Sequence, residues 1–307
     1  MRSAVIDSIY QQMKENSQVY FLTGDLGFSV VEKIEAAFPD RFINMGIAEQ
    51  NMIGVAAGLA LTGKKVYVYS IIPFVTMRCF EQIRNDLCYH NLDVTLVGAG
   101  AGLSYGILSA THFALEDVAI FRPLPHMSIF SPSDATTAEL GMKYLSGHHG
   151  PVYVRMGKKI EPTIYEKAYP FVFGKAQLYS EGNDILIVTS GPIMSEAVSA
   201  AKLLEAQNIT STILDIHTIK PLDADAIQKH VQGKKLIVTV EEHSVTGGLG
   251  SAVLESLSTF SHPPLLRIGT QDEFIKVTGT QEYLRGVVGL TASDIAEKIE
   301  KVFAERS

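Results

Sequence analysis

One carboxylate occupies an unusual position in this sequence, at the start of a helix made almost wholly of apolar and small residues. The stretch from Arg41 to Gly63 reads RFINMGIAEQNMIGVAAGLALTG, which predicts a short strand, a turn at Gly46 and a helix that begins near Glu49. Burying an isolated carboxylate is costly, so a buried Glu49 would have to be protonated, paired or bonded to a ligand. Proton transfer is one use for such a group. The alternative is that Glu49 only favours the helix dipole from the first turn.

The elements that must position Glu49 alternate between strands and helices along the whole chain. The predicted strands are VYFLTG, RFINM, KKVYVYS, DVTLVGAG, MSIFSP and PVYVRMG in the first half, and DILIVTSG, STILDIH, KLIVTVEE and PLLRIG in the second. Helical patterns lie between them, including one from Thr76 to Cys88 and a final one from about Ser293. This alternation predicts an α/β protein with parallel sheets.

The alternation is interrupted after Gly157 by the segment KKIEPTIYEKAYP, which is polar and contains proline. A chain of 307 residues is long enough for two separate cores. We therefore predict two doubly wound domains. A parallel-sheet domain spans residues 1–157, a linker spans 158–171, and a smaller mixed-sheet domain spans 172–307.

Composition excludes several classes of protein. The sequence is 46% hydrophobic and 19% charged, which argues against disorder, and its net charge of −7 argues against a nucleic-acid partner. No apolar run approaches the length of about 18 residues that a membrane span needs. Cys79 and Cys88 fall in a predicted helix without metal-ligand spacing, which suggests reduced, packed thiols. We expect a cytoplasmic protein with no membrane partner and no metal ligands of its own.

A glycine-rich stretch, TGGLGSAV from Thr246 to Val253, could bind an anion at the start of a helix. It lacks the Walker lysine and the full dinucleotide-binding pattern. The sequence therefore favours a structural turn at this position.

Several motifs occur in an order that resembles one known family. GIAEQNMIGVAAGLA, FEQIRNDLCYHNLDVTLVG, GLSYG, THFALEDVAIFRPLPHMSIFSPSD and GPVYVRMGK resemble the pyrimidine-binding domain of transketolase and its relatives. DIHTIKPLD and EEHSVTGGLG resemble the C-terminal domain of the same enzymes. The resemblance extends from about Tyr20 to beyond Gly250 and implies thiamin diphosphate as the cofactor.

The resemblance implies a catalytic role for Glu49. A carboxylate at N1′ of the cofactor's aminopyrimidine drives the tautomer change that lets the thiazolium C2 proton leave. The pyrimidine also needs an apolar wall, for which Phe74 is the candidate, with core packing as the alternative. In other relatives the aromatic residue is one position later, where this chain has Val75. The remaining cofactor-binding residues implied by the resemblance are Ile47, Asp25 and Leu26.

The resemblance also implies residues that meet the substrate. His112, in SATHFALED, matches the histidine that faces the donor, where proton transfer at a carbonyl is needed. Arg155, in PVYVRMGK, matches an arginine that contacts a sugar phosphate. Ser29 aligns with a phosphate-contacting serine. The structural alternatives are a helix-capping histidine, a salt bridge for Arg155 and a solvated loop position for Ser29.

Two family motifs are missing. The GDG motif and the later asparagine, which hold the metal bridging the diphosphate, have no counterpart, because the nearest string, GDL from Gly24 to Leu26, belongs to the pyrimidine-domain pattern. A partner chain would have to hold Mg²⁺ and the diphosphate. The GEDG motif before the histidine is replaced by Gly106, Ile107, Leu108 and Ser109, and a family histidine twelve residues before His112 is replaced by Gly100.

We therefore predict the pyrimidine-binding subunit of a two-chain transketolase, active as an α2β2 complex with a diphosphate-binding subunit. It would transfer a two-carbon ketol unit from a ketose or ketose phosphate to an aldose. Leu108 cannot bond a donor hydroxyl as aspartate would, so the donor stays open. The alternatives are a decarboxylating relative, similar to 1-deoxyxylulose-phosphate synthase or a 2-oxoacid dehydrogenase β-subunit, and a non-catalytic assembly subunit.

Overall fold

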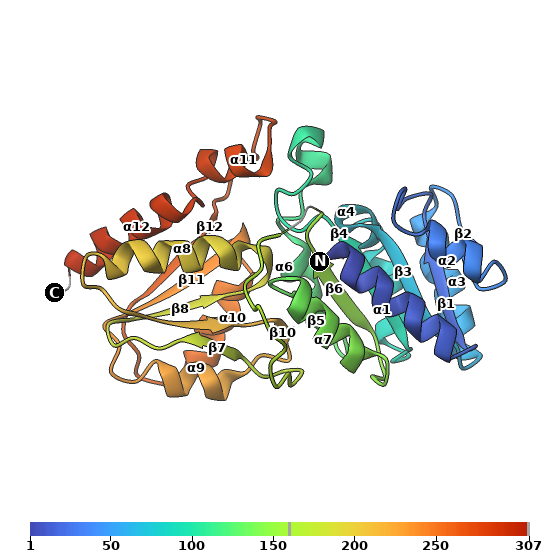
Figure 1. Ribbon diagram of the computed structural model, residues 1–307, viewed down its shortest axis with the longest axis horizontal. Helices are drawn as coiled ribbons and strands as arrows, with labels where there is room; N and C mark the ends of the chain where they lie inside the picture. The colour runs from blue at the N-terminus through green and yellow to red at the C-terminus, as the bar shows by residue number, and fades with distance from the viewer. Residues whose placement is uncertain (159–160, 306–307) are drawn as a thin grey trace.

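Two β-sheets, each with helices on both faces, form the framework of the protein (Figure 1). The computed structural model describes residues 1–158 and 161–305. Within them, one sheet has seven strands and the other has five, and one strand at the edge of each sheet runs antiparallel to its neighbour. The predicted α/β class, with a second, smaller mixed sheet, is confirmed.

The seven-stranded sheet carries the strands predicted in the first half of the chain. In spatial order they are β10 (Thr218–Lys220), β5 (Ser128–Phe130), β6 (Val152–Met156), β4 (Val94–Ala99), β3 (Lys65–Ile71), β1 (Val19–Thr23) and β2 (Phe42–Asn44). The five-stranded sheet has the order β12 (Leu265–Thr270), β11 (Leu236–Ser244), β8 (Ile185–Thr189), β9 (Ser211–Asp215) and β7 (Gln177–Ser180).

The helices divide between the two sheets in chain order. Those of the first half are α1 (Arg2–Glu15), α2 (Glu32–Ala37), α3 (Glu49–Leu61), α4 (Ile72–Val75), α5 (Phe80–Gln82), the π-helix η1 (Ile83–Cys88), the 3₁₀ turns η2 (Gly106–Leu108) and η3 (Ala110–His112), α6 (Asp117–Phe121) and α7 (Ala135–Leu145). Those of the second half are the 3₁₀ turn η4 (Gly191–Ile193), α8 (Met194–Glu205), α9 (Ala224–His230), α10 (Leu249–Leu257), α11 (Gln281–Val287) and α12 (Ala292–Ala304).

Strand alternation distributes the core over both faces of the first sheet. Along β3, Val66 and Val68 join the cluster that contains α3, whereas Tyr67 and Tyr69 join the cluster that contains α1 and α7. The first of these clusters continues into the second domain, where it includes Leu249 and other residues of α10. The two domains therefore share part of their hydrophobic core.

The structure differs from the predicted elements at several places, and strand β7 at the edge of the second sheet is one that was not predicted. Strand β10 lies in the second half of the sequence but pairs with β5, so the chain crosses back into the first sheet. The helix predicted from Thr76 to Cys88 is divided into turns, the short α5 and a π-helix. The boundaries of the predicted linker stay a prediction, and Lys159 and Ile160 within it lie outside the described residues.

The glycine-rich stretch before α10 is a structural turn, as the sequence favoured. The backbone N–H groups of Leu249 and Gly250 donate to the Glu241 carboxylate over 2.7 and 2.9 Å. A carboxylate of this chain thus occupies the position that an external anion would take.

Candidate active site

Most of the predicted cofactor and substrate residues lie at one edge of the seven-stranded sheet. They follow the carboxyl ends of parallel strands, which is where open α/β sheets form their sites. Asp25 and Leu26 come after β1, Ile47 and Glu49 after β2, Phe74 after β3, and His112 after β4. An ideal Cβ at Gly24 would lie 3.5 Å from Oε1 of Glu49, so the β1 loop borders this carboxylate directly.

Glu49 is the first residue of α3 and is almost completely buried, at 2% exposure. Its Oε2 lies 2.8 Å from Nη1 of Arg78, and Ser70 Oγ donates to Oε1 over 3.4 Å. Of the three states that we predicted for a buried Glu49, the structure has the paired one. An interaction with the helix dipole alone would not require this burial or this partner.

The Phe74 ring links the Glu49 pair to His112. The guanidinium carbon of Arg78 lies 4.5 Å from the centroid of the Phe74 ring. The His112 ring packs edge-on against the same ring, with 5.1 Å between centroids. Cys79 Sγ donates to the Phe74 carbonyl over 3.2 Å, which anchors the backbone of this turn. The carboxylate, the aromatic ring and the histidine therefore form one continuous wall.

His112 is partly exposed and lies among aromatic and basic groups. Its Nδ1 is 2.9 Å from Thr111 Oγ1, and its ring is 5.8 Å from that of Tyr105. Burial lowers the pKa of His112, and the positive charge of Lys158 lowers it further. The imidazole is therefore neutral near pH 7 and can either accept or donate a proton.

The other predicted cofactor residues lie in loops beside Glu49. Asp25 is exposed, and its backbone N–H donates to Asn44 Oδ1 over 2.9 Å. The carbonyl of Leu26 accepts a hydrogen bond of 2.8 Å from Thr23 Oγ1. Ile47 is 81% exposed, which is unusual for a large apolar side chain.

Comparison with known proteins identifies the family. Residues 1–162 match the transketolase pyrimidine binding domain, and residues 174–295 match the transketolase C-terminal domain. The chain belongs to the transketolase family. Membership of this family implies dependence on thiamin diphosphate.

Relatives of similar length are transketolase subunits. The chain is 35% identical to the 6-deoxy-6-sulfo-D-fructose transketolase subunit SqwH of Clostridium sp. strain MSTE9, over 98% of this chain and 94% of that protein. It is 36% identical to an apulose-4-phosphate transketolase subunit of Phocaeicola vulgatus, over 96% of this chain and 95% of that protein. A solved split-gene transketolase, described as an inactive β4 tetramer, matches with a TM-score of 0.89 and 37% identity over 100% of this chain and 98% of that one. The protein is thus a transketolase-like transferase subunit.

Arg155, for which the transketolase resemblance implied phosphate binding, is already paired within the chain. This residue is buried at 4% exposure, and its Nε donates to Asp117 Oδ2 over 2.7 Å. Its Nη2 donates to the carbonyls of Ala114 and Glu242 over 2.9 and 3.1 Å. Burial would raise the pKa of Asp117, but the charge of Arg155 holds it below its usual value. Arg155 is therefore a structural ion-pair partner, the alternative that the sequence left open.

Ser29 lies in an exposed loop with a positive φ of 63°. Its backbone N–H donates to the Glu32 carboxylate in the first turn of α2. No described contact joins its hydroxyl to Glu49 or His112, so its substrate-binding role stays a prediction.

Three residues at this candidate site were not predicted from the sequence. Arg78 follows Phe74 by four residues, and this helical spacing could have identified it as a partner for the same wall. Lys158 follows β6 and places its Nζ 4.3 Å from the centroid of the Tyr105 ring. Tyr105 lies in the same loop as His112, after β4, whereas Lys158 comes from the loop after β6 and reaches this loop only through the fold.

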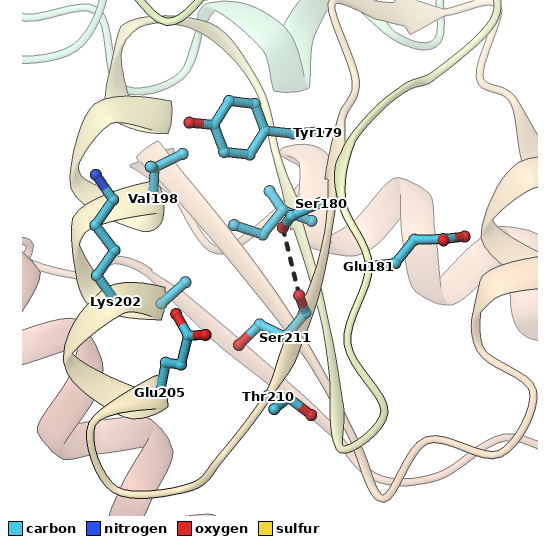
Figure 2. Close-up of a pocket in the computed structure, with 10 residues that line it drawn as sticks. Tyr179, Ser180, Glu181, Val198, Lys202, Glu205, Thr210 and Ser211 are labelled. Carbon is cyan, nitrogen blue, oxygen red and sulfur yellow. Dashed lines mark hydrogen bonds between the residues drawn. The ribbon is translucent and has the colours of Figure 1, made fainter.

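The rest of the described structure offers few other candidate sites. No group of three potential metal ligands occurs within residues 1–158 and 161–305. No helix in the same part of the chain is long and apolar enough to cross a membrane. A groove of about 220 Å³ lies in the second domain between α8 and strands β7 and β9 (Figure 2). Its lining contains none of the predicted site residues and includes Tyr179, Lys202, Glu205 and Ser211.

Proposed function

We propose that this chain is the pyrimidine-binding subunit of a two-chain transketolase that transfers a two-carbon ketol unit from a ketose, or ketose phosphate, to an aldose. One observation carries the proposal. The buried carboxylate of Glu49, at the start of α3, shares a wall with the Phe74 ring and the His112 imidazole. This arrangement offers a carboxylate, an apolar ring contact and a neutral proton carrier on one side of a single site.

The residues at this edge of the sheet fit the pyrimidine half of thiamin diphosphate. When bound, the cofactor supplies the nucleophilic carbon that attacks a carbonyl and retains the two-carbon unit. Glu49 would hold the pyrimidine through a hydrogen bond, and burial would strengthen that bond because water is excluded. Phe74 and the exposed Ile47 would supply apolar contact, and the loop of Asp25 and Leu26 would border the ring.

The chain's own groups would handle the substrate's protons and charge. His112, neutral near pH 7, would move a proton at the substrate oxygen next to the bond that breaks. Arg78 would keep the Glu49 carboxylate oriented through its 2.8 Å contact. Lys158, in place of Arg155, would bind the anionic end of a sugar phosphate, because its ammonium group lies beside Tyr105 and near His112.

A partner chain would complete the site. The sequence has no GDG motif, and the described residues include no cluster of metal ligands, so Mg²⁺ and the diphosphate would be held by a diphosphate-binding subunit. We propose an α2β2 assembly in the cytoplasm. The free, buried state of Cys79 and Cys88 is compatible with that compartment.

The test is reconstitution with the partner. A reading frame beside this gene that carries the GDG motif would be co-expressed with it, and the purified pair would be assayed with Mg²⁺, thiamin diphosphate and a panel of ketoses. We expect an α2β2 mass and the release of an aldose two carbons shorter than the donor, without carbon dioxide. Carbon dioxide release from a 2-oxoacid would instead assign the decarboxylating alternative. Cofactor binding without turnover of any donor would assign an assembly subunit.

A further inference from the structure

Position 100 holds a glycine, and the ring of Tyr105 occupies the space that a side chain at this position would need. Gly100 follows β4 and has a φ of +97°, a conformation that other residues rarely adopt. An ideal Cβ at this position would lie 2.2 Å from both Cδ2 and Cε2 of Tyr105. No real Cβ tolerates such a contact, so a side chain at position 100 and the ring of Tyr105 exclude each other.

Tyr105 lies between the two groups that we assign to the substrate. Its ring is 5.8 Å from the His112 ring, and Lys158 Nζ is 4.3 Å from its centroid. Only 8% of the residue is exposed, and burial raises its pKa to about 12, so the phenol stays protonated. Tyr105 is therefore a fixed, uncharged wall beside the proposed donor position.

The rest of the loop adds apolar surface to this wall. Leu108 and Ile107 are 42% and 70% exposed in η2, between Tyr105 and His112 in sequence. The loop itself is held in place from the second domain. The N–H of Leu103 donates to Glu242 Oε1 over 2.8 Å, and a Cβ at Gly106 would lie 2.3 Å from the Gly279 carbonyl oxygen. Figure 1 shows this segment beside α11.

We propose that Tyr105 determines donor specificity: its ring lies between His112 and Lys158 and makes the donor site favour pentulose 5-phosphates that lack the C4 hydroxyl, which is the hydroxyl between the bond that breaks and the phosphate. This inference rests on the proposed transketolase function. A sugar hydroxyl placed against the ring and Leu108 would lose its hydrogen bond to water and gain none. Such a loss corresponds to roughly one to two decades in kcat/KM.

The experiment compares two donors that differ in one hydroxyl. The α2β2 complex would be assayed with xylulose 5-phosphate and with 4-deoxypentulose 5-phosphate, for the wild type and for Tyr105→Phe, Tyr105→Val and Tyr105→Leu. Both donors carry the same phosphate, so a change at Lys158 should alter kcat/KM for both of them equally. The ratio of the two kcat/KM values therefore reports on the C4 hydroxyl alone. Exchange of the thiazolium C2 proton, measured by NMR without donor, reports whether each variant still folds and activates the cofactor.

We expect the wild type and Tyr105→Phe to prefer the deoxy donor by about tenfold or more. Tyr105→Val or Tyr105→Leu should reduce that preference at least fivefold while C2 exchange stays at the wild-type rate. Leu108→Asp should raise kcat/KM for xylulose 5-phosphate specifically. An unchanged preference in the aliphatic variants would overturn the role of Tyr105, and so would efficient wild-type use of xylulose 5-phosphate. If the wild-type complex exchanges the C2 proton normally but consumes neither donor, the proposed class of donor is wrong and the cofactor role stands. If the wild-type complex shows no C2 exchange, the proposed function itself is wrong.

Discussion

At the scale of single residues, the environment of Glu49 decides what its carboxylate can do. A buried carboxylate needs a partner, and the partner here is Arg78, whose side chain is itself 45% exposed. A partner so accessible to water and to ligands stabilises the charge without sealing the site. Oε1 has only a long contact with Ser70 and so retains capacity to accept a stronger hydrogen bond.

Glu49→Gln should therefore separate chemistry from structure. The amide keeps the shape of the side chain but cannot accept and return a proton, so turnover of the reconstituted enzyme should fall by at least two orders of magnitude. Folding and assembly should change little. NMR exchange at the thiazolium C2 position measures the affected step. Glu35→Gln, on the exposed part of α2, is the matched control, and a wild-type exchange rate in Glu49→Gln would refute the assignment.

Lys158 tests the proposed site for the substrate's anionic group. Lys158→Met keeps a long apolar stem but removes the charge, so KM for phosphorylated donors should rise about tenfold or more, with a smaller effect on kcat. An uncharged donor, such as an unphosphorylated ketose, should be affected much less. Lys143→Met, on the exposed face of α7, serves as the control. An equal effect on charged and uncharged donors would contradict this role.

At the scale of elements, the loop after β4 is positioned by the second domain and not by its own strand alone. Glu242, at the end of β11, accepts the Leu103 N–H and two hydrogen bonds from Arg285. Arg285 also contacts Glu196 over 3.1 Å. The carboxylate thus ties a helix of the second domain to the backbone that leads into the donor loop.

Glu242→Gln should loosen this loop, and Glu196→Gln is a close control. Both substitutions remove a negative charge opposite Arg285, but only Glu242 also holds the Leu103 N–H. Both should lower stability, by about 1–4 kcal/mol, because a largely buried guanidinium loses part of its pairing. Only Glu242→Gln should speed amide hydrogen exchange across residues 100–112, by about tenfold or more. Equal exchange in the two variants would show that Glu242 acts only through Arg285.

Most elements could be predicted from the sequence because their patterns are local. The helix that begins at Glu49, for example, follows from a nearly continuous run of apolar and small residues. The pairing of β10 with β5 could not be predicted, since a strand as short as Thr218–Lys220 carries no recognisable period. The site divides in the same way. Glu49 can be recognised as a candidate from its own segment. Tyr105 and Lys158 could not be, because they come together only where the loops after β4 and β6 meet in the fold.

At the scale of the whole molecule, the interface between the domains contains a buried acid. Asp215, at the end of β9, accepts a 2.7 Å hydrogen bond from Ser133 of the first domain and one of 3.2 Å from Tyr165. It is fully buried, and its Oδ1 has no described partner. Burial raises its pKa to about 7. The domain interface therefore includes a group whose ionisation opposes the folded state.

The contribution of Asp215 to stability should consequently fall as the pH rises from about 4 to about 7. An unfolded aspartate has a pKa of about 3.9, so between about pH 4 and 7 the folded state binds a proton that the unfolded state does not. Above pH 7 the full cost of ionising Asp215 is present. The free energy of unfolding of Asp215→Asn, relative to that of the wild type, should thus be about 1–3 kcal/mol larger at pH 8 than at pH 5. Calorimetric melting at both pH values tests this, and an identical difference at the two would contradict it.

The proposed cofactor site would be incomplete in this chain alone, and cofactor binding by the isolated chain can test this. In the proposed site, Glu49, Phe74 and Ile47 would contact only the pyrimidine half of thiamin diphosphate. The charged half would need metal ligands, and no cluster of such ligands occurs among the described residues. The high exposure of Ile47 leaves an apolar contact that a partner subunit would cover. Calorimetry on the isolated chain with Mg²⁺ and cofactor should show only weak binding and no transferase activity. Addition of the diphosphate-binding subunit should bring binding into the micromolar range or tighter. Submicromolar binding by the chain alone would mean that the metal and diphosphate ligands come from this subunit after all.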